Sequence, residues 1–552
     1  MFVAFSDQIL MFQNVYSLFR TQTEKYGDMP VFYTRDGDEW RSRTWRDFEE
    51  QVHNAACAFL AKGLTRGASV AILAGNIPEW SIVDIAAIAA GGVGVGIYPT
   101  SSTEQCEYII NHSDAEFVVV DTTTQLNKLS GLGLPKVKEI LVIQPKDTLP
   151  NGRVSAFGEF LELGRERRDE LMPRVEEIGL NASFDDVAIM VYTSGTTGEP
   201  KGAMLSHRYI LNSVESLRRS VPIFDTDVAF SYLPGCHVAE RISGIYNRLY
   251  NGTPAYFVND LSRLYEYMLE VRPTVFASLP RFFEKIHAAL LSEPGAVATG
   301  FDPKKVNAAF GGRMRLLTSG GAPLPNEIAQ SFADAGLPIL QAYGLTENIC
   351  VAFNTVEHHK FGTVGRPMPM CDVRIAGDGE ILVKSPMMFS GYYKAPDKTT
   401  EMFDAEGWLK TGDLGELDED GFLKITGRKK EIIVLSSGKN VAPALVENLV
   451  KESHLISHCM VHGDGRSYCV ALITINETEA ANMCREEIQG FVEQAVQRAN
   501  SRVSNSEQIK RFTILDRDFS GENDEVTPTM KLKRTVVARH FKHVIDKLYE
   551  NA

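Results

Sequence analysis

From about residue 66 to residue 343, short runs of apolar and β-branched residues alternate with longer stretches of helical pattern. This alternation is typical of α/β layers in which the strands pair largely in parallel. A predicted strand is followed by a predicted helix at residues 69–74 and 82–90, 228–233 and 241–250, 274–279 and 281–291, and 314–318 and 326–335. Further strands are predicted at residues 117–121 and 139–144. An α/β fold is therefore expected for this part of the chain.

The pattern changes after this region. Residues 363–426 consist of short strands and Gly turns, and Asp418-Glu-Asp-Gly421 is a good hairpin signal. Beyond Arg428 lie roughly 120 residues that predict a small α+β domain. Its predicted helices are residues 443–453 and 487–503, and its predicted strands are residues 459–462 and 468–475.

The length of 552 residues is too great for one compact core, so two or more domains are expected. We expect a large N-terminal domain at residues 1–428, made of layered α/β subdomains and a small β-rich subdomain at about residues 362–428. A small α+β C-terminal domain is expected at residues 429–552.

One loop has the composition of an anion-binding site. Tyr192-Thr-Ser-Gly-Thr-Thr-Gly-Glu-Pro-Lys201-Gly follows a predicted strand at residues 187–191 and precedes a predicted helix at residues 204–219. Glycines allow backbone N–H groups to converge on phosphate oxygens, hydroxyls add donors, and the lysine adds positive charge. The phosphate loop of NTPases is excluded, because it requires Gly-Lys followed by Ser or Thr, whereas Lys201 lies between Pro200 and Gly202.

Four further motifs fit the same chemistry. They are Thr318-Ser-Gly-Gly-Ala-Pro-Leu324, Gln341-Ala-Tyr-Gly-Leu-Thr-Glu347, Gly407-Trp-Leu-Lys-Thr-Gly-Asp413-Leu-Gly with Ile425-Thr-Gly-Arg428, and Thr527-Pro-Thr-Met-Lys-Leu-Lys-Arg534.

These motifs together resemble the adenylate-forming superfamily of acyl-CoA synthetases, luciferases and peptide-synthetase adenylation domains. The resemblance runs from about Phe19 to about Phe541. It implies two half-reactions: ATP and a carboxylic acid give an acyl-adenylate and pyrophosphate, and a thiol, usually coenzyme A, then displaces AMP. It also implies a large N-terminal domain and a small mobile C-terminal one.

The resemblance implies specific roles for nucleotide-binding residues. Tyr343 would stack on adenine, Thr346 would meet the α-phosphate, and Glu347 would help to hold Mg²⁺, a hard cation that takes oxygen ligands. Asp413 would accept hydrogen bonds from the ribose hydroxyls, and Arg428 would add a second ribose or phosphate contact. The remaining nucleotide contacts would come from Gly321 and Ala322 at the adenine pocket and from Thr193, Ser194, Gly195, Thr196, Thr197, Gly198 and Lys201 in the phosphate loop.

The C-terminal motif aligns Lys531 with the catalytic lysine of the family, which bridges the attacking carboxylate and the α-phosphate. Met530 stands where the common pattern has glycine, and Lys533 is a second candidate that its spacing to Arg534 disfavours. The same resemblance implies that the small domain rotates about a hinge at Lys430. Rotation would bring the region around Gly438 to the thiol and coenzyme A side of the site.

Two segments resemble the long-chain fatty acyl-CoA synthetase branch. They are Leu233-Pro-Gly-Cys-His237-Val-Ala-Glu-Arg241 and Leu279-Pro-Arg-Phe-Phe-Glu-Lys285-Ile. The branch implies that His237 lies beside the carboxylate end of the acyl pocket. Gly235 and Cys236 replace a bulkier pair that is common there, which leaves pocket width and chain-length preference open.

Bulk composition limits the classes of partner and cofactor that this chain is expected to bind. The net charge of −14 argues against a nucleic-acid partner, and eight scattered cysteines indicate neither a zinc site nor a disulfide framework. The start of the chain lacks the features of a secretory signal, and the apolar stretch at residues 82–98 fits a buried helix and strand better than a membrane span. A cytoplasmic protein is expected. Peripheral membrane contact and the oligomeric state stay open.

The function predicted is that of an ATP-dependent long-chain fatty acid–CoA ligase. One alternative keeps the adenylate-forming step but transfers the acyl group to a carrier-protein thiol, and another uses a different carboxylic acid. A third alternative is a non-catalytic nucleotide or acyl-binding protein. The motifs argue against it, because such a protein would need neither a carboxylate for a metal nor a movable lysine.

Overall fold

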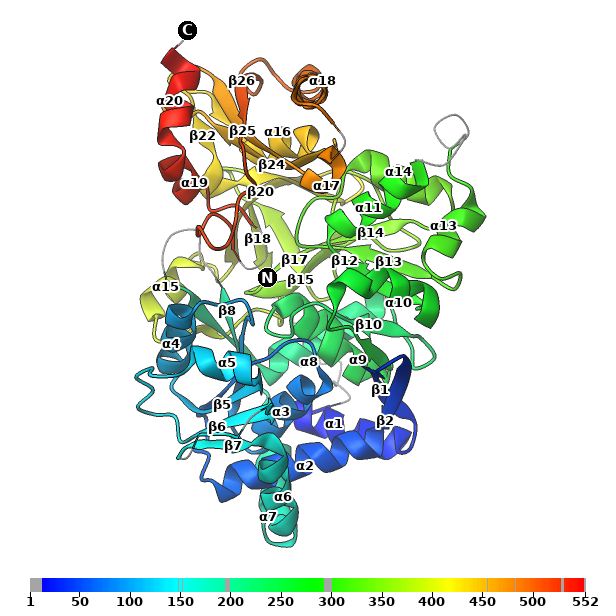
Figure 1. Cartoon of the computed structure of the whole chain (residues 1–552), viewed down its shortest axis with the longest axis vertical. Helices are drawn as coiled ribbons and strands as arrows, with labels where there is room; N and C mark the ends of the chain where they lie inside the picture. Colours follow the sequence, from blue (N-terminus) through cyan, green and yellow to red (C-terminus); the bar gives the residue numbers. More distant parts are fainter. Residues whose placement is uncertain are drawn as a thin grey trace.

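The computed structural model describes residues 12–146, 148–150, 152–193, 199–291, 300–453, 455–481, 483–527 and 531–550. The chain is built on two large sheets flanked by helices, a smaller antiparallel sheet, and a C-terminal unit that lies at one end of the molecule (Figure 1). The predicted α/β class and the division into a larger N-terminal and a smaller C-terminal part are confirmed.

The first large sheet, which we name the β3 sheet, has the strand order β19-β9-β8-β4-β3-β5-β6-β7. Strands β8, β4, β3, β5, β6 and β7 pair in parallel, whereas β9 and β19 add antiparallel strands at one edge. The bounds are β3 Ser69–Leu73, β4 Val93–Ile97, β5 Ala115–Thr122, β6 Glu139–Gln144, β7 Val154–Ala156, β8 Val187–Thr193, β9 Lys201–Ser206 and β19 Gly391–Tyr392.

The second large sheet, the β12 sheet, has the strand order β16-β15-β14-β13-β12-β10-β11-β1-β2. Its central strands are parallel, and antiparallel strands close both edges. The bounds are β1 Pro30–Asp36, β2 Glu39–Thr44, β10 Ala229–Ser231, β11 Ala255–Phe257, β12 Val275–Ser278, β13 Leu316–Ser319, β14 Ile339–Leu345, β15 Asn348–Phe353 and β16 Arg366–Pro367.

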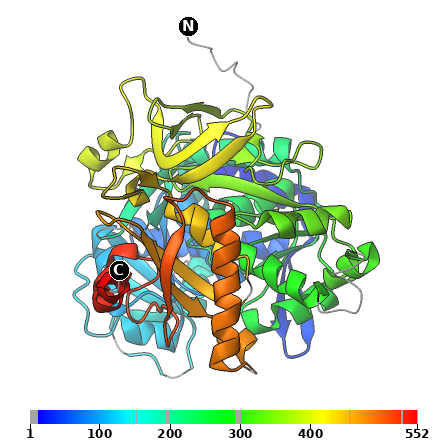
Figure 2. The same cartoon turned by 90° about the horizontal axis from the view of Figure 1, so that it is seen from above.

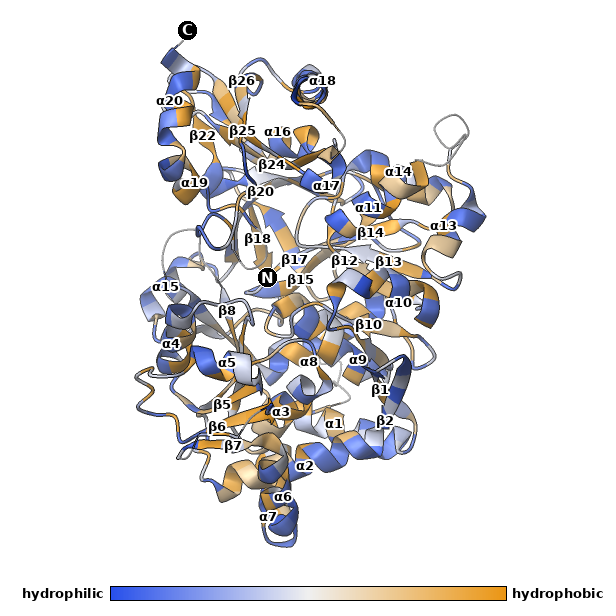
Figure 3. Cartoon of the chain, in the orientation of Figure 1, coloured by the Kyte–Doolittle hydropathy of each residue, from blue (hydrophilic) through white to orange (hydrophobic). Residues whose placement is uncertain are grey.

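Successive side chains of a strand point to opposite faces of its sheet, so each sheet packs against a separate layer on either side. In β3, Val70 and Ile72 join the main core, whereas Ala71 and Leu73 point to the opposite face. The main core lies between the two sheets and is filled by α1 Val15–Tyr26, α2 Trp45–Ala61, α3 Pro78–Ala89, α8 His207–Ser220, the π-helix η1 Ala239–Tyr246 and α9 Asn247–Asn251. Figure 3 shows the strongly apolar strands of this interior.

Other helices cover the outer faces. Over the β3 sheet lie α4 Thr103–His112 and α5 Thr123–Lys128, and beside α2 lie α6 Phe157–Glu166 and α7 Arg168–Leu180. Over the β12 sheet lie η2 Leu261–Arg263, α10 Leu264–Val271, α11 Pro280–Leu291, α13 Pro303–Ala309 and α14 Asn326–Asp334. No helix in the described parts of the chain is both long and apolar enough to span a bilayer.

The predicted hairpin around Asp418 joins β20 Leu409–Leu417 to β21 Leu423–Arg428. These strands form an antiparallel sheet with β17 Asp372–Ile375 and β18 Glu380–Lys384, and α15 Pro396–Glu401 lies between β19 and β20 in the chain.

The C-terminal elements enclose their own sheet, β24-β25-β26. One face of it packs on α16 and α18, and the other packs on α19 and α20 (Figure 2). The bounds are the 3₁₀ helix η3 Lys429–Glu431, β22 Ile433–Val434, β23 Asn440–Val441, α16 Pro443–Val450, β24 Ile456–His462, β25 Cys469–Ile475, α17 Glu477–Ala480, α18 Arg485–Ser501, β26 Ile509–Ile514, α19 Arg534–His540 and α20 Lys542–Glu550.

One element prediction was wrong. The helix predicted at residues 204–219 begins at His207, and the residues before it form β9, which pairs antiparallel with β8. The residues after the loop therefore form a strand that pairs with the strand before it, and the helix begins only at His207. The short apolar run before Ser206 carries no period that distinguishes strand from helix, and pairing with β8 and β19 decides it. The side chain of Ser206 then caps α8 by accepting from the Tyr209 N–H.

Candidate functional site

Most of the predicted site segments follow the carboxyl ends of parallel strands. In the β12 sheet, strands β10, β12, β13 and β14 run in one direction, so their carboxyl ends lie on one edge. His237 follows β10, Gly321 and Ala322 follow β13, and the turn with Thr346 and Glu347 follows β14. Ligands of parallel α/β sheets bind at this edge, where the carboxyl ends of the strands and the N-termini of the following helices converge.

The phosphate loop is closed by a pair of facing residues. Thr193, the last residue of β8, lies opposite Lys201, the first residue of β9. The ammonium of Lys201 lies 5.1 Å from the centroid of the Tyr392 ring, a cation–π contact. Ser194, Gly195, Thr196, Thr197 and Gly198 lie outside the described residues.

The turn after β14 is held by two hydrogen bonds to a buried tyrosine. The hydroxyl of Tyr209 donates to the carbonyl of Thr346 at 3.0 Å and accepts from the N–H of Ile349 at 3.1 Å. Glu347 is buried, and one of its carboxylate oxygens accepts a hydrogen bond from the hydroxyl of Tyr392. The carboxylate proposed from sequence as a metal ligand is therefore held rigidly.

Tyr343, Asp413 and Arg428 form one connected group. The hydroxyl of Tyr343 donates to Oδ2 of Asp413 at 2.6 Å, and Nε of Arg428 donates to Oδ1 at 2.9 Å. Asp413 on β20 faces Arg428 on β21 directly in the register of the hairpin. Burial, and then the charge of Asp413, raises the pKa of Tyr343 well above its usual range, so its hydroxyl stays a donor.

Lys531 enters this group from the C-terminal unit. Its side chain keeps access to solvent, yet the surrounding protein displaces enough water to lower its pKa below the ordinary value. The positive charge of Arg428 lowers that pKa further, whereas the charges of Asp413 and Glu431 raise it. The Lys531 ammonium therefore lies within range of the Asp413 group, since charges in a protein interact over about 10 Å. The other candidate, Lys533, is paired with Asp524.

His237, which the sequence predicts to lie beside the acyl pocket, is electrostatically coupled to Lys531. Its Nδ1 accepts from the N–H of Ala239 at 3.2 Å, at the start of the π-helix η1. Burial, and then the positive charge of Lys531, lowers the pKa of His237 to about 4. The imidazole is therefore neutral at pH 7. The coupling brings together two sequence-predicted residues that are 294 positions apart in the chain.

The small pair before His237 does not leave open space. A Cβ at Gly235 would lie 2.9 Å from the Trp80 ring, and one at Gly96 would lie 2.5 Å from Cys236. Trp80 is buried, and the guanidinium of Arg241 lies 4.8 Å from its ring centroid. The indole of Trp80 thus occupies the volume that a bulkier side chain at Gly235 would take.

Within the described part of the chain, the remaining predicted residues form no hydrogen bond or ion pair with Asp413, and each has its own local geometry. Gly321 has φ +77°, which favours glycine, and its nearest neighbour is Leu279; Ala322 is exposed. Lys430 is exposed in η3, and Gly438 forms the turn between β22 and β23 with φ +77°. Lys429, beside the predicted hinge, is ion-paired with Asp378 and with Glu380 of β18.

The residues around Glu347 suit a divalent cation that is held mainly by phosphates. Glu347 offers a hard oxygen donor beside the cationic end of the phosphate loop. Among the residues that the structure describes, no three His, Cys, Asp or Glu side chains gather to hold a metal by themselves. Mg²⁺ bound to a nucleotide needs only one or two protein carboxylates.

Sequence reasoning missed Tyr392, Tyr209 and Glu431. Tyr392 belongs to a strand of two residues, too short for any periodic signal, and Tyr209 and Glu431 lack a motif.

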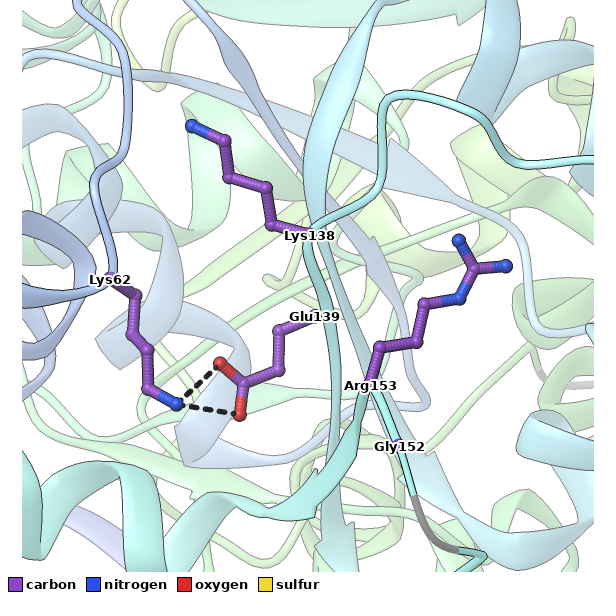
Figure 4. A pocket seen from close by; sticks show the side chains of 5 residues that line it. All are labelled: Lys62, Lys138, Glu139, Gly152 and Arg153. Carbon is purple, nitrogen blue, oxygen red and sulfur yellow. Dashed lines mark hydrogen bonds and ion pairs between the residues drawn. The ribbon is translucent and has the colours of Figure 1, made fainter.

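A surface hollow elsewhere carries no comparable arrangement. It is lined by Lys62, Lys138, Glu139, Gly152 and Arg153 and lies beside β6 and β7 (Figure 4). Lys62 pairs with Glu139, while Lys138 and Arg153 point away and bind Glu116 and the carbonyl of Leu134, respectively. The cations of this hollow are thus already neutralised or hydrogen-bonded.

Comparison with known families agrees with this geometry. The family described as AMP-binding enzyme matches residues 19–393, and the family described as AMP-binding enzyme C-terminal domain matches residues 430–552. The chain belongs to the AMP-binding enzyme family. It is 34% identical to the long-chain-fatty-acid–CoA ligase FadD15 of Mycobacterium bovis, with 94% of each chain covered. It is 30% identical to the long-chain-fatty-acid–CoA ligase ACSBG2 of Homo sapiens, covering 96% of this chain and 91% of that one.

Solved structures of low identity share the AMP-binding fold. The anthranilate CoA ligase AuaEII in complex with anthranoyl-AMP matches with a TM-score of 0.80 at 19% identity, over 97% of this chain and 98% of that one. A fatty acyl CoA synthetase of Mycobacterium tuberculosis matches with a TM-score of 0.67 at 20% identity, over 96% of this chain and 99% of that one.

Proposed function

We propose that this AMP-binding enzyme is an ATP-dependent ligase that joins a long-chain fatty acid to coenzyme A through an acyl-adenylate. Family membership supplies the reaction class, and the names of the relatives supply the substrate class. The observation that carries the proposal is the position of Lys531, within electrostatic range of Asp413, Arg428 and His237. A nucleotide-binding protein without catalysis would have no use for a cation delivered there.

In the first half-reaction, a carboxylate oxygen forms a bond to the α-phosphorus of ATP. The bond from that phosphorus to the oxygen bridging to the β-phosphate breaks, and pyrophosphate leaves with the electron pair. The ammonium of Lys531 offsets the negative charge of both reactants as they meet. His237, which is neutral and electrostatically coupled to Lys531, lies on the side of the site that binds the acyl chain.

The N-terminal side orients the nucleotide. Asp413, fixed by Tyr343 and Arg428, receives the ribose hydroxyls, and Tyr343 also offers its ring to the adenine. Thr346 meets the α-phosphate. The phosphate-loop residues around Lys201 hold the β- and γ-phosphates, and Gly321 and Ala322 border the base. Mg²⁺, held by Glu347 and the phosphates, would neutralise charge on the departing pyrophosphate.

In the second half-reaction, the thiol sulfur of coenzyme A bonds to the acyl carbon. AMP leaves with the electron pair, and the thiol proton passes to solvent. We place the domain boundary between Arg428 and Lys429, with Lys430 as the hinge that turns the C-terminal domain. Gly438, in an exposed turn with positive φ, then faces the thiol.

We infer a cytoplasmic location with transient contact to membranes. The eight cysteines all fall within the described residues and carry free thiols, as is typical of a reducing compartment. Long-chain fatty acids partition into bilayers, so their ligase benefits from touching a membrane surface. Pelleting with phosphatidylcholine vesicles, with and without oleate, tests the contact.

Acid-dependent exchange of labelled pyrophosphate into ATP tests the first half-reaction. Acids of graded chain length, with Mg²⁺ and without coenzyme A, should support exchange, most strongly among long chains. Adding coenzyme A should then release AMP. Exchange without transfer to coenzyme A would favour a carrier-protein acceptor, and absence of exchange with every acid would refute the proposal.

A further inference from the structure

Tyr392 touches two predicted parts of the nucleotide site at once. Its hydroxyl donates to Oε1 of Glu347, and the face of its ring lies 5.1 Å from the ammonium of Lys201. Lys201 ends the phosphate loop, and Glu347 is the proposed ligand of Mg²⁺. One buried aromatic side chain therefore joins the phosphate cation to the metal carboxylate, although no motif of the sequence pointed to it.

The backbone leaves this tyrosine little freedom. Tyr392 pairs with Ala203 of β9, and its N–H donates to Oγ1 of Thr399 at 2.8 Å. Gly391, at φ +124°, could not carry a Cβ, since that atom would lie 2.9 Å from Thr399. The side chain is therefore fixed in direction by the strand that carries it.

The carboxylate is fixed from the same segment. The N–H of Phe389 donates to the backbone carbonyl of Glu347 at 2.8 Å, and the rings of Phe389 and Tyr392 meet edge-to-face at 4.9 Å. The same short segment therefore contacts Glu347 twice, through the N–H of Phe389 and through the hydroxyl of Tyr392.

We propose that Tyr392 is a positioning residue that orients the carboxylate of Glu347 for Mg²⁺ while its ring holds the ammonium of Lys201 beside the phosphates. This inference rests on the proposed function, because it assumes that Glu347 meets a nucleotide-bound cation. Hydrogen bonds that orient metal-binding carboxylates typically change metal affinity about 10- to 100-fold when they are removed.

The competing interpretation is that Tyr392 only fills the core. Tyr392→Phe separates the two, since phenylalanine keeps the volume and the ring face but loses the hydroxyl. Tyr393→Phe is a matched control: the neighbouring hydroxyl donates to Asp114 at 3.0 Å, away from Glu347. Both variants should unfold thermally within a few degrees of the wild type.

The experiment is a titration of Mn²⁺, detected by electron paramagnetic resonance, with a non-hydrolysable ATP analogue and no fatty acid. Tyr392→Phe should weaken Mn²⁺ binding to the enzyme–nucleotide complex about tenfold, and Tyr393→Phe should leave it unchanged. In a Glu347→Gln background the Tyr392→Phe change should have little further effect on Mn²⁺ affinity, because the carboxylate that the hydroxyl orients is already gone.

Three outcomes would overturn the inference. They are wild-type affinity in Tyr392→Phe, equal weakening in Tyr393→Phe, and additive effects with Glu347→Gln. Failure of the wild-type enzyme to bind metal and nucleotide at all would instead count against the proposed function. The two failures are therefore distinguishable.

Discussion

The two sides of the proposed site are built differently. On the N-terminal side, Glu347 and Asp413 are 8% and 5% exposed, and each is hydrogen-bonded by a tyrosine from another segment. On the C-terminal side, Lys531 has an exposed side chain, and its backbone is hydrogen-bonded to Thr527. Glu347 and Asp413 are thus held in place by packing within the N-terminal part. Lys531 comes from the C-terminal unit.

The lysine segment is nevertheless fixed to its own unit. Arg534, three residues on, is paired with Glu447 of α16 and Glu431 of η3. These ion pairs fasten the segment that carries Lys531 to the rest of the C-terminal unit. A hydrogen-bonded contact joins that unit to α11: the guanidinium of Arg281 donates to the carbonyl of Ser457 at 2.6 Å. The comparison shows that packing fixes the positions of Glu347 and Asp413, whereas the position of Lys531 depends on how the C-terminal unit is oriented.

The largest effect is expected from Lys531→Ala. Loss of this charge should slow adenylation by about 10² or more, while thioester formation from supplied acyl-adenylate survives. Pyrophosphate exchange and single-turnover thioester formation measure the two. Lys533→Ala is the control, because its ammonium is paired with Asp524 and should contribute little. Equal loss of both half-reactions, or no loss, would show that the lysine is not specific to adenylation.

The next effect is expected from Lys430→Pro. Proline fixes φ at the proposed hinge, so thioester formation should fall on the order of tenfold more than adenylation. Lys429→Ala tests the neighbouring anchor to Asp378 and Glu380 without restricting the backbone. If the two half-reactions of Lys430→Pro slowed equally, the pivot would have to lie elsewhere.

A smaller effect concerns the stability of the N-terminal side in acid. Burial lowers the pKa of His207 to about 4, and its Nδ1 accepts from the N–H of Val15. The unfolded chain takes up a proton at about 6.5. Stability therefore falls as pH drops from 6.5 toward 4 and levels off below it.

His207→Asn, which keeps an acceptor but does not titrate, should remove roughly 1 kcal/mol of the loss between pH 7.5 and 5.5. Urea unfolding followed by tryptophan emission measures this, because Trp40, Trp45, Trp80 and Trp408 all precede Arg428. An unchanged pH dependence in the variant would place the acid sensitivity in other groups.

The smallest effect is expected from Arg281→Ala. Losing one accessible hydrogen bond between the units should lower adenylation about threefold relative to thioester formation, because the orientation that delivers Lys531 becomes less populated. Lys285→Ala, exposed on the same helix, is the matched control. A greater loss of thioester formation would mean that the contact belongs to the other orientation.

Much of the architecture was predictable from local sequence. The strand predicted at residues 139–144 is β6, and the helix predicted at 281–291 is α11 within one residue. Long periodic stretches and turn residues carry this information, because each strand or helix must bury its own apolar face. The strand β9 was not predictable in this way, because it depends on partners on both sides, one of them about 190 residues away in the chain.

The sequence by itself determined the layered α/β class, the motif residues and, through their resemblance, the reaction class. The tertiary structure decided which of those residues meet: it faced Asp413 with Arg428, brought Lys531 to them and to His237, and placed Tyr392 between Lys201 and Glu347. The physical reason is that hydrogen bonds act over about 3 Å and screened coulombic forces over about 10 Å of space, while a motif records only spacing along the chain.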